Sequence, residues 1–90
     1  MLKRTEFHSA HQYSSNHRKQ ILASEQCACF YCGEDFPPSL IGEWVDEDEN
    51  EIGQTALCPI CGIDSVLGDN SGLELSKEFL SGMHEVWFNI

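Results

Sequence analysis

Residues at helical spacing mark the two ends of the chain. Positions that share one helix face recur every three or four residues between residues 5 and 24, in the series Phe7, Ala10, Ser14, His17 and Ile21. The polar run at residues 14–16 predicts a break in this helix, with Ser15 as the N-cap of a second helical piece. We therefore expect residues 1–26 to form a helical N-terminal segment.

A stronger helical pattern lies near the other end. Its apolar face consists of Phe79, Leu80, Met83, Val86 and Trp87. Ser76 precedes this run as an N-cap, and Glu78 falls in the first turn, where a negative charge is favoured by the helix dipole. The pattern predicts a C-terminal helix over residues 76–88 that packs its apolar face against the rest of the chain.

Between these helices the pattern is that of short strands and turns. Residues 43–45 and 55–57 have the character of two paired strands, and residues 63–67 that of a further short strand. The acidic run at residues 46–51 is expected to form the exposed tip of the hairpin. These features predict a small α+β fold with a β-hairpin core.

Four cysteines form two Cys-x-x-Cys turns, each followed by glycine. The first contains Cys29 and Cys32, the second contains Cys58 and Cys61, and 25 residues separate the two turns. Each turn aims both sulfurs to one side, so a hairpin between them can bring four thiolates to one point. The spacing predicts one metal ion per chain, with zinc favoured and iron as the minority alternative. Because a closed Cys₄ site has no open coordination position, the site is expected to be structural.

Further metal ligands remain open alternatives. Cys27 could exchange with Cys29, but only Cys29 has the knuckle spacing to Cys32, which favours a buried, apolar role for Cys27. His8 and His11 share a helix face and could form a second site, but no thiol or carboxylate accompanies them at ligand spacing. A redox role for the first Cys-x-x-Cys turn is disfavoured because no βαβ pattern surrounds it.

Size and cysteine number agree with a metal-stapled protein. Ninety residues bury a modest apolar core, so a staple is expected. The five cysteines are an odd number, no export signal precedes them, and no run of about 18 apolar residues is present. We therefore expect a cytoplasmic protein without disulfides and without membrane contact.

Charge is distributed unevenly along the chain. Four of the five basic residues lie in the first nineteen positions, and Lys77 is the fifth. Residues 20–76 contain twelve acidic residues and no Lys or Arg. Four thiolates on a divalent ion would add a further net charge of −2. Because phosphate recognition needs Lys or Arg on the binding face, nucleic acid is an unlikely partner.

A protein with a basic surface is the expected partner, since acidic faces attract such surfaces and raise the association rate. The expected contacts are the aromatic residues of the acidic stretch and the acids of the hairpin tip: Phe36, Trp44, Asp46, Glu47, Asp48 and Glu49. The alternative is that these acids only maintain solubility. The sequence does not indicate an oligomeric state.

Four motifs resemble one family. They are Cys27-Ala-Cys-Phe-Tyr-Cys, Phe36-Pro-Pro-Ser-x-Ile-x-Glu-Trp, Thr55-Ala-Leu-Cys-Pro-Ile-Cys-Gly and Lys77-Glu-Phe-Leu. Together they resemble small bacterial zinc-ribbon proteins of unknown function, usually described only as cytoplasmic proteins. The resemblance covers most of the chain and implies a cytosolic location and the same four cysteine ligands, but no activity. The two knuckles are also similar to those of rubredoxins, whose site holds iron.

The combined expectation is a single zinc-binding domain over residues 1–90. Its zinc ribbon, with rubredoxin-type knuckles, spans residues 27–68 between the N-terminal helical segment and the C-terminal helix. The favoured function is a protein-interaction module with a structural Cys₄ site. The alternatives are a nucleic-acid-associated zinc ribbon, and a rubredoxin-like electron carrier or small metalloenzyme. An enzyme or electron carrier would need iron at the Cys₄ site or an open metal position that uses His8, His11 or Cys27, and an enzyme is the less favoured interpretation.

Overall fold

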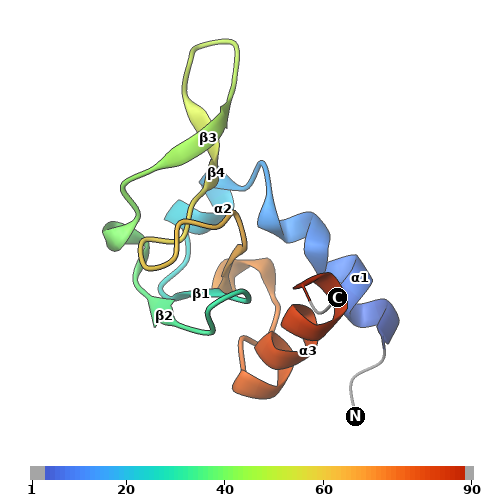
Figure 1. Ribbon diagram of the computed structural model, residues 1–90. Coiled ribbons are helices and arrows are strands. Elements are labelled where there is room, and N and C mark those ends of the chain that lie inside the picture. Colours follow the sequence, from blue (N-terminus) through green and yellow to red (C-terminus); the bar gives the residue numbers. More distant parts are fainter. Residues whose placement is uncertain (1–3, 89–90) are drawn as a thin grey trace.

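The computed structural model describes residues 4–88 and shows an α+β fold with a helix at each end of the chain (Figure 1). Along the chain the elements are α1 (Arg4–Ala10), the 3₁₀ turn η1 (His11–Ser14), α2 (Arg18–Leu22), β1 (Cys27–Cys29), β2 (Asp35–Phe36), η2 (Pro38–Leu40), β3 (Trp44–Glu47), β4 (Gly53–Ala56), β5 (Val66–Gly68), η3 (Asp69–Ser71) and α3 (Lys77–Phe88). The predicted class, a small α+β fold with an N-terminal and a C-terminal helix, is confirmed. Within this range no helix is both long and apolar enough to cross a bilayer.

Three short strands form an antiparallel sheet in the order β2-β1-β5. Cys27 in the central strand β1 lies opposite Phe36 on one side and Gly68 on the other. All three residues of β1 are buried, because both faces of the strand are covered: Ala28 lies in one apolar cluster, and Cys27 and Cys29 lie in another. The first cysteine turn connects β1 to β2, and the second is joined to β5 by a short segment that contains Ser65, so this sheet helps to position both.

Strands β3 and β4 form a separate hairpin that extends away from α1 and α3, with α2 packed at its base (Figure 1). Trp44 pairs with Ala56 at its base. The hairpin predicted over residues 43–45 and 55–57 is confirmed, with its strands displaced by one or two residues. The molecule is elongated, with principal extents of 41 × 23 × 22 Å.

The N-terminal helical segment is broken where the sequence predicts. Asn16 adopts a positive φ of 48°, and α2 starts two residues later. The prediction that Ser15 caps α2 is wrong: His17 occupies that position and makes no side-chain cap bond. The reason is tertiary, because the Asn16 amide donates to Thr55 Oγ1 and the His17 amide to the Gln54 carbonyl, each at 2.8 Å. Contacts with β4 therefore set the start of α2.

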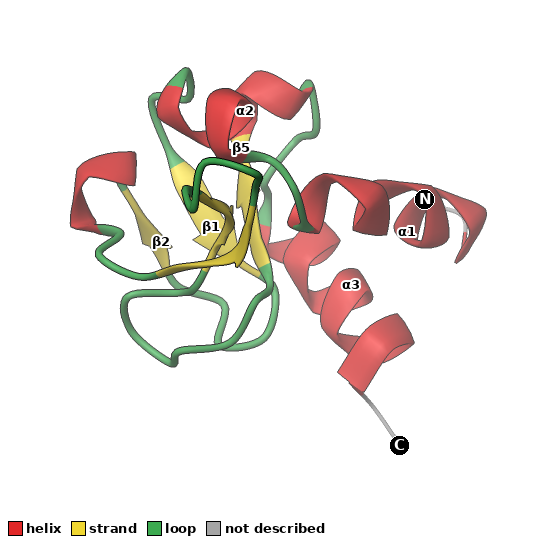
Figure 2. Cartoon of the chain, turned by 90° about the horizontal axis from the view of Figure 1, so that it is seen from above, coloured by secondary structure: helices red, strands yellow, loops and turns green. Residues whose placement is uncertain are grey.

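Helices α1 and α3 lie side by side against the three-stranded sheet (Figure 2). They share one buried cluster with β1 and β5: Phe7, Ala10, Ala28, Phe30, Leu67, Phe79, Leu80 and Met83. The predicted packing of α3 is confirmed for its buried residues, and Ser76 accepts a hydrogen bond from the Phe79 amide at 3.1 Å, as its N-cap role requires. Trp87 is 36% exposed and donates to the Phe7 carbonyl at 3.1 Å.

A second buried cluster surrounds the cysteines. It contains Ile21, Cys27, Cys29, Phe36, Ile41, Ala56, Cys58 and Val66. Its members come from α2, from both sheets and from the second cysteine turn. The hairpin, the sheet and the N-terminal segment therefore meet at the candidate metal centre.

Candidate metal centre

Both cysteine turns have the same backbone geometry. In the first, the Gly33 amide donates to the Cys29 carbonyl, and in the second the Gly62 amide donates to the Cys58 carbonyl, each at 2.9 Å. Both glycines have a φ of 81°, a left-handed conformation that costs glycine little and other residues more. The Cys-x-x-Cys-Gly pattern is therefore required by the turn itself. The chain builds the same knuckle twice.

Backbone amides point at one sulfur of each knuckle. The amides two and three residues after Cys29 lie 3.3 and 3.5 Å from its Sγ. The amides at the same positions after Cys58 both lie 3.4 Å from its Sγ. Hydrogen bonds to the charged form of a group favour that form. Each knuckle thus directs two backbone amides at the sulfur of its first cysteine.

The four sulfurs converge on one point. Cys29 Sγ lies 3.6 Å from Cys61 Sγ, Cys32 Sγ lies 3.8 Å from Cys58 Sγ, and all four sulfurs are within 4.8 Å of one another. Four sulfurs at about 2.3 Å from a central zinc ion, at the corners of a tetrahedron, would be about 3.8 Å apart. The spacing between the sulfurs fits a tetrahedrally coordinated ion, and the four cysteines form a site compatible with metal binding.

Ionisation of the cluster also favours a bound cation. Burial opposes charge on Cys58, but the amide hydrogens of Cys61 and Ile60 lower the pKa of its thiol below the ordinary value. Burial and the neighbouring sulfur of Cys29 raise the pKa of Cys32 and of Cys61. One thiolate therefore forms readily, but four cannot coexist this closely unless a cation balances their charge.

Ser65 is part of the centre, although no sequence pattern indicates this role. Its side chain is 0% exposed, and its hydroxyl lies 2.9 Å from Cys29 Sγ, close enough to donate to a thiolate. Its carbonyl accepts a hydrogen bond from the Phe30 amide at 3.0 Å, within the first knuckle. Ser65 lies between the second knuckle and β5, so it links the two halves of the site. Only the fold brings it to Cys29, 36 residues away in sequence.

Cys27 lies in the core and outside the four-sulfur cluster. It is fully buried in β1, in the apolar cluster with Ile21 and Phe36. Burial, reinforced by the negative charge of Asp69, raises the pKa of its thiol to about 11. A neutral thiol of this kind behaves as a small apolar side chain.

His8 and His11 lie on α1 and η1 and face an aromatic side chain. The rings of His8 and His11 have their centroids 5.1 and 4.0 Å from that of Trp87 in α3. Among the residues with described side chains, the four cysteines are the one group of three or more possible ligands close enough to hold an ion. The two histidines therefore belong to the contact between the helical ends of the chain.

The two aromatic residues expected at the partner surface differ in position. The expectation that Phe36 is exposed is wrong: it is 1% exposed, because β2 pairs with β1 and turns the ring into the cysteine cluster. Trp44 is half-buried at the base of the hairpin, with the Arg18 guanidinium 4.5 Å from its ring centroid. The expected acidic contacts, Asp46, Glu47, Asp48 and Glu49, are all exposed.

A buried histidine secures the hairpin beside the centre. His17 Nδ1 lies 2.6 Å from the Tyr13 carbonyl, and its Nε2 accepts a hydrogen bond from the Ala56 amide at 3.0 Å. One neutral tautomer satisfies both bonds. Burial lowers the pKa of His17, although the bond to the Tyr13 carbonyl partly opposes this. Because β4 leads directly into the second knuckle, His17 helps to position Cys58.

The donor set limits what the centre can do. Four convergent thiolates suit zinc or iron, and a closed set leaves no coordination position for a substrate.

In comparisons with protein-family models, curated proteins and solved structures, no match to this chain was found. Function must therefore be inferred from the residues and their geometry.

Proposed function

We propose that this chain is a zinc-stabilised protein-interaction module that presents an acidic hairpin to a basic surface of a protein partner. Cys29, Cys32, Cys58 and Cys61 would hold one zinc ion, as in the zinc-ribbon proteins that the chain resembles. The observation that carries the metal assignment is the convergence of four sulfurs at tetrahedral spacing. The ion would stabilise the fold, because folding brings its ligands together, and would support no reaction, because four thiolates leave no open coordination position.

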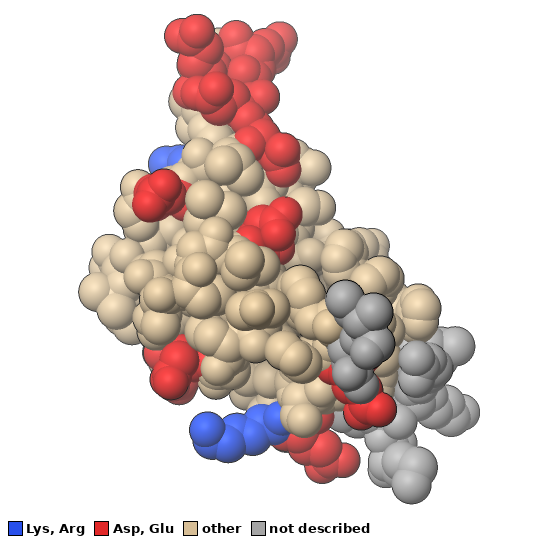
Figure 3. Space-filling view, in the orientation of Figure 1, with Lys and Arg blue, Asp and Glu red and all other residues tan. Residues whose placement is uncertain are grey.

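The shape of the hairpin supports an interaction role. Acidic side chains gather at its outer end, as the space-filling view shows (Figure 3). The turn is organised by Asp48, whose carboxylate accepts hydrogen bonds from the amides of Asn50 and Ile52 at 2.9 and 3.0 Å. Thr55 donates to the Asp46 carboxylate at 2.7 Å. The acids thus lie on an ordered projection.

The base of the hairpin is held against the N-terminal segment. Arg18 donates to the Gly53 carbonyl at 2.9 Å and covers the Trp44 ring. Together with the bonds of Asn16 and His17, these contacts fix the direction in which the tip points. A preorganised projection loses less conformational entropy when it binds than a mobile loop would.

The sign of the charge selects the partner class. Phosphate binding gains affinity by releasing counterions from the nucleic acid, and an acidic tip makes this contribution unfavourable. A basic protein surface would be attracted, chiefly through a faster association that weakens with salt. A cytoplasmic location is part of the proposal, since a reducing compartment keeps thiols available for metal.

The test is co-purification of partners from cytosol at low and high salt. The test variant changes Asp46, Glu47, Asp48 and Glu49 to their amides. A matched control changes four exposed acids elsewhere, Glu25, Glu34, Asp64 and Glu85, and so has the same net charge. We expect a protein partner that is lost at high salt and with the hairpin variant but kept with the control. Tight binding of nucleic acid at physiological salt, or a partner indifferent to both changes, would contradict the proposal.

A further inference from the structure

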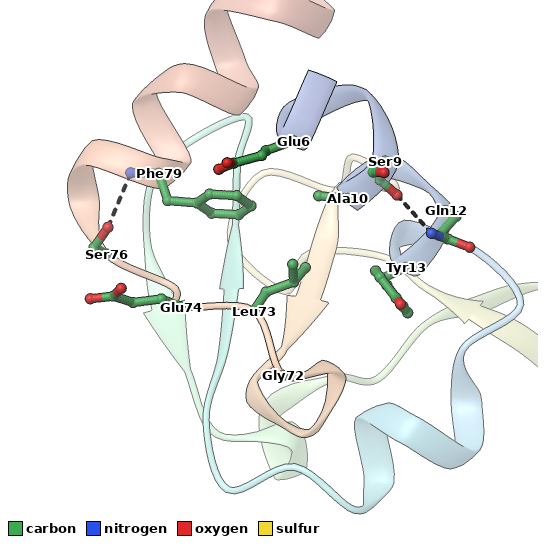
Figure 4. Close-up of a pocket in the computed structure, with 10 residues that line it drawn as sticks. All are labelled: Glu6, Ser9, Ala10, Gln12, Tyr13, Gly72, Leu73, Glu74, Ser76 and Phe79. Atoms are coloured by element: carbon green, nitrogen blue, oxygen red, sulfur yellow. Dashed lines mark hydrogen bonds between the residues drawn. The ribbon is translucent and has the colours of Figure 1, made fainter. Parts of the chain in front are cut away.

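An open groove runs between the N-terminal helical segment and the stretch that leads into α3 (Figure 4). Its volume is about 350 Å³. One wall comes from α1 and η1, and the other from residues 72–76 and the first turn of α3. Its apolar surface is formed by Ala10, Tyr13, Leu73 and Phe79.

Two carboxylates line this apolar surface from opposite walls. Glu6 projects from α1, and Glu74 from the stretch before α3 (Figure 4). Both are exposed, and neither is hydrogen-bonded to another of the groove residues drawn in Figure 4. Among residues 6–88, whose side chains are described, no lysine, arginine or histidine lines the groove. A ligand with an apolar stem and a positive end would match both its surface and its charge.

The backbone beside the groove also has free hydrogen-bonding capacity. Residues 73–75 lie outside helices and strands. Within the described range, neither the amide nor the carbonyl of Glu74 takes part in a backbone hydrogen bond. Exposed backbone of this kind can pair with an extended peptide.

We propose that this groove binds an extended segment of a protein partner and takes one of its lysine or arginine side chains between Glu6 and Glu74. The stem of that side chain packs on Phe79 and Tyr13, and the backbone of the segment pairs with Glu74. The inference rests on the proposed function in one respect, the basic character of the partner. It adds a contact site separate from the hairpin, one that recognises a single residue in an extended strand.

The structure argues against a metal ion in the groove. Two carboxylates are present, but no group of three possible ligands gathers there among the described side chains. An open groove also encloses less of a small molecule than the cavities that bind free ligands. The occupant is therefore a side chain delivered by a longer segment whose backbone adds contacts.

The test is a titration of the full, zinc-loaded chain, labelled with ¹⁵N, followed through its amide shifts. The probe is the blocked peptide acetyl-Thr-Val-Arg-Val-Thr-amide, and its matched control has Gln in place of Arg. We expect saturable shifts at the amides of Ala10, Leu73, Glu74 and Phe79. The control peptide should bind about fivefold more weakly or worse, as loss of two exposed charge contacts implies.

Variants of the chain distinguish binding in the groove from nonspecific attraction of the peptide to a negatively charged protein. Glu6→Gln combined with Glu74→Gln should weaken the Arg peptide about fivefold, whereas Glu85→Gln with Glu25→Gln, the same charge change outside the groove, should leave affinity within about twofold. The four-acid hairpin variant should still bind the peptide. Equal affinity for the two peptides, shifts confined to the hairpin, or no loss in the Glu6 and Glu74 variant would each overturn the inference. If the groove fails one of these tests while a protein partner still binds the hairpin in a salt-sensitive way, the groove site is disproved and the proposed function is not affected.

Discussion

Replacing Gly82 by alanine should have two opposing effects on the free energy of unfolding, each of known size. Gly82 lies inside α3, where alanine is normally favoured over glycine by about 1 kcal/mol. Here an added Cβ would lie 3.0 Å or less from three atoms of the Phe7 ring. That ring is buried between α1 and α3, with its centroid 5.8 Å from that of Phe79. The glycine is therefore explained by the close approach of the two helices.

The clash should outweigh the gain in helix propensity. Overpacking a core costs about 1–3 kcal/mol, and turning the ring out to water would cost about as much in lost burial. With a central value of about 2 kcal/mol and a gain of about 1, Gly82→Ala should lower the free energy of unfolding by about 1 kcal/mol. For a chain of this size, the midpoint temperature of thermal unfolding should fall by about 4–8 °C.

The assay is thermal unfolding of the zinc-saturated chain followed by circular dichroism. Ser81→Ala, at the exposed neighbouring helix position, is the control and should be neutral or slightly stabilising. Combining Gly82→Ala with Phe7→Leu should cost less than the sum of the two changes, because the smaller side chain removes the overlap. An unchanged or raised midpoint for Gly82→Ala alone would refute the packing of Phe7 on this face of α3.

Two further predictions concern side chains near the metal centre. Ser65→Ala should weaken zinc binding about tenfold in competition with a chelator, because it removes the hydroxyl beside Cys29 Sγ; an unchanged affinity would contradict this. The pKa of His17 is lowered in the folded chain. When the pH falls below about 6.5, His17 is therefore protonated more readily in the unfolded chain than in the folded chain, and the free energy of unfolding decreases. In denaturant titrations from pH 7 to pH 5, wild type should lose more stability than His17→Gln, and equal losses would contradict this role.

The sequence predicted features that depend on local spacing. The knuckles follow from Cys-x-x-Cys-Gly, since the turn needs a residue that accepts a φ of 81°. The break near Asn16 and the cap at Ser76 follow from the short-range chemistry of polar side chains. These features require no knowledge of distant parts of the chain.

The convergence of the two knuckles was predictable from their paired spacing, but other features that depend on distant contacts were not. Strands β1 and β2 are too short to produce an alternating pattern, so the pairing that buries Phe36 left no trace in the sequence. Ser65 and His17 act on groups 36 and 39 residues away. Ser15 was expected to cap α2 because it has the right side chain, but backbone bonds from Asn16 and His17 to β4 moved the start of the helix.

The central claim is that four cysteines hold one zinc ion that stabilises the fold. It is tested most directly by metal analysis and a visible spectrum of the purified chain, compared with Cys58→Ser and Cys27→Ser. We predict one zinc per chain, no colour, loss of metal and of folded structure in Cys58→Ser, and full metal content in Cys27→Ser, because folding and binding are coupled. A coloured iron centre would contradict the zinc assignment. A metal-free chain that folds cooperatively, or metal lost from Cys27→Ser but kept in Cys29→Ser, would contradict the site itself.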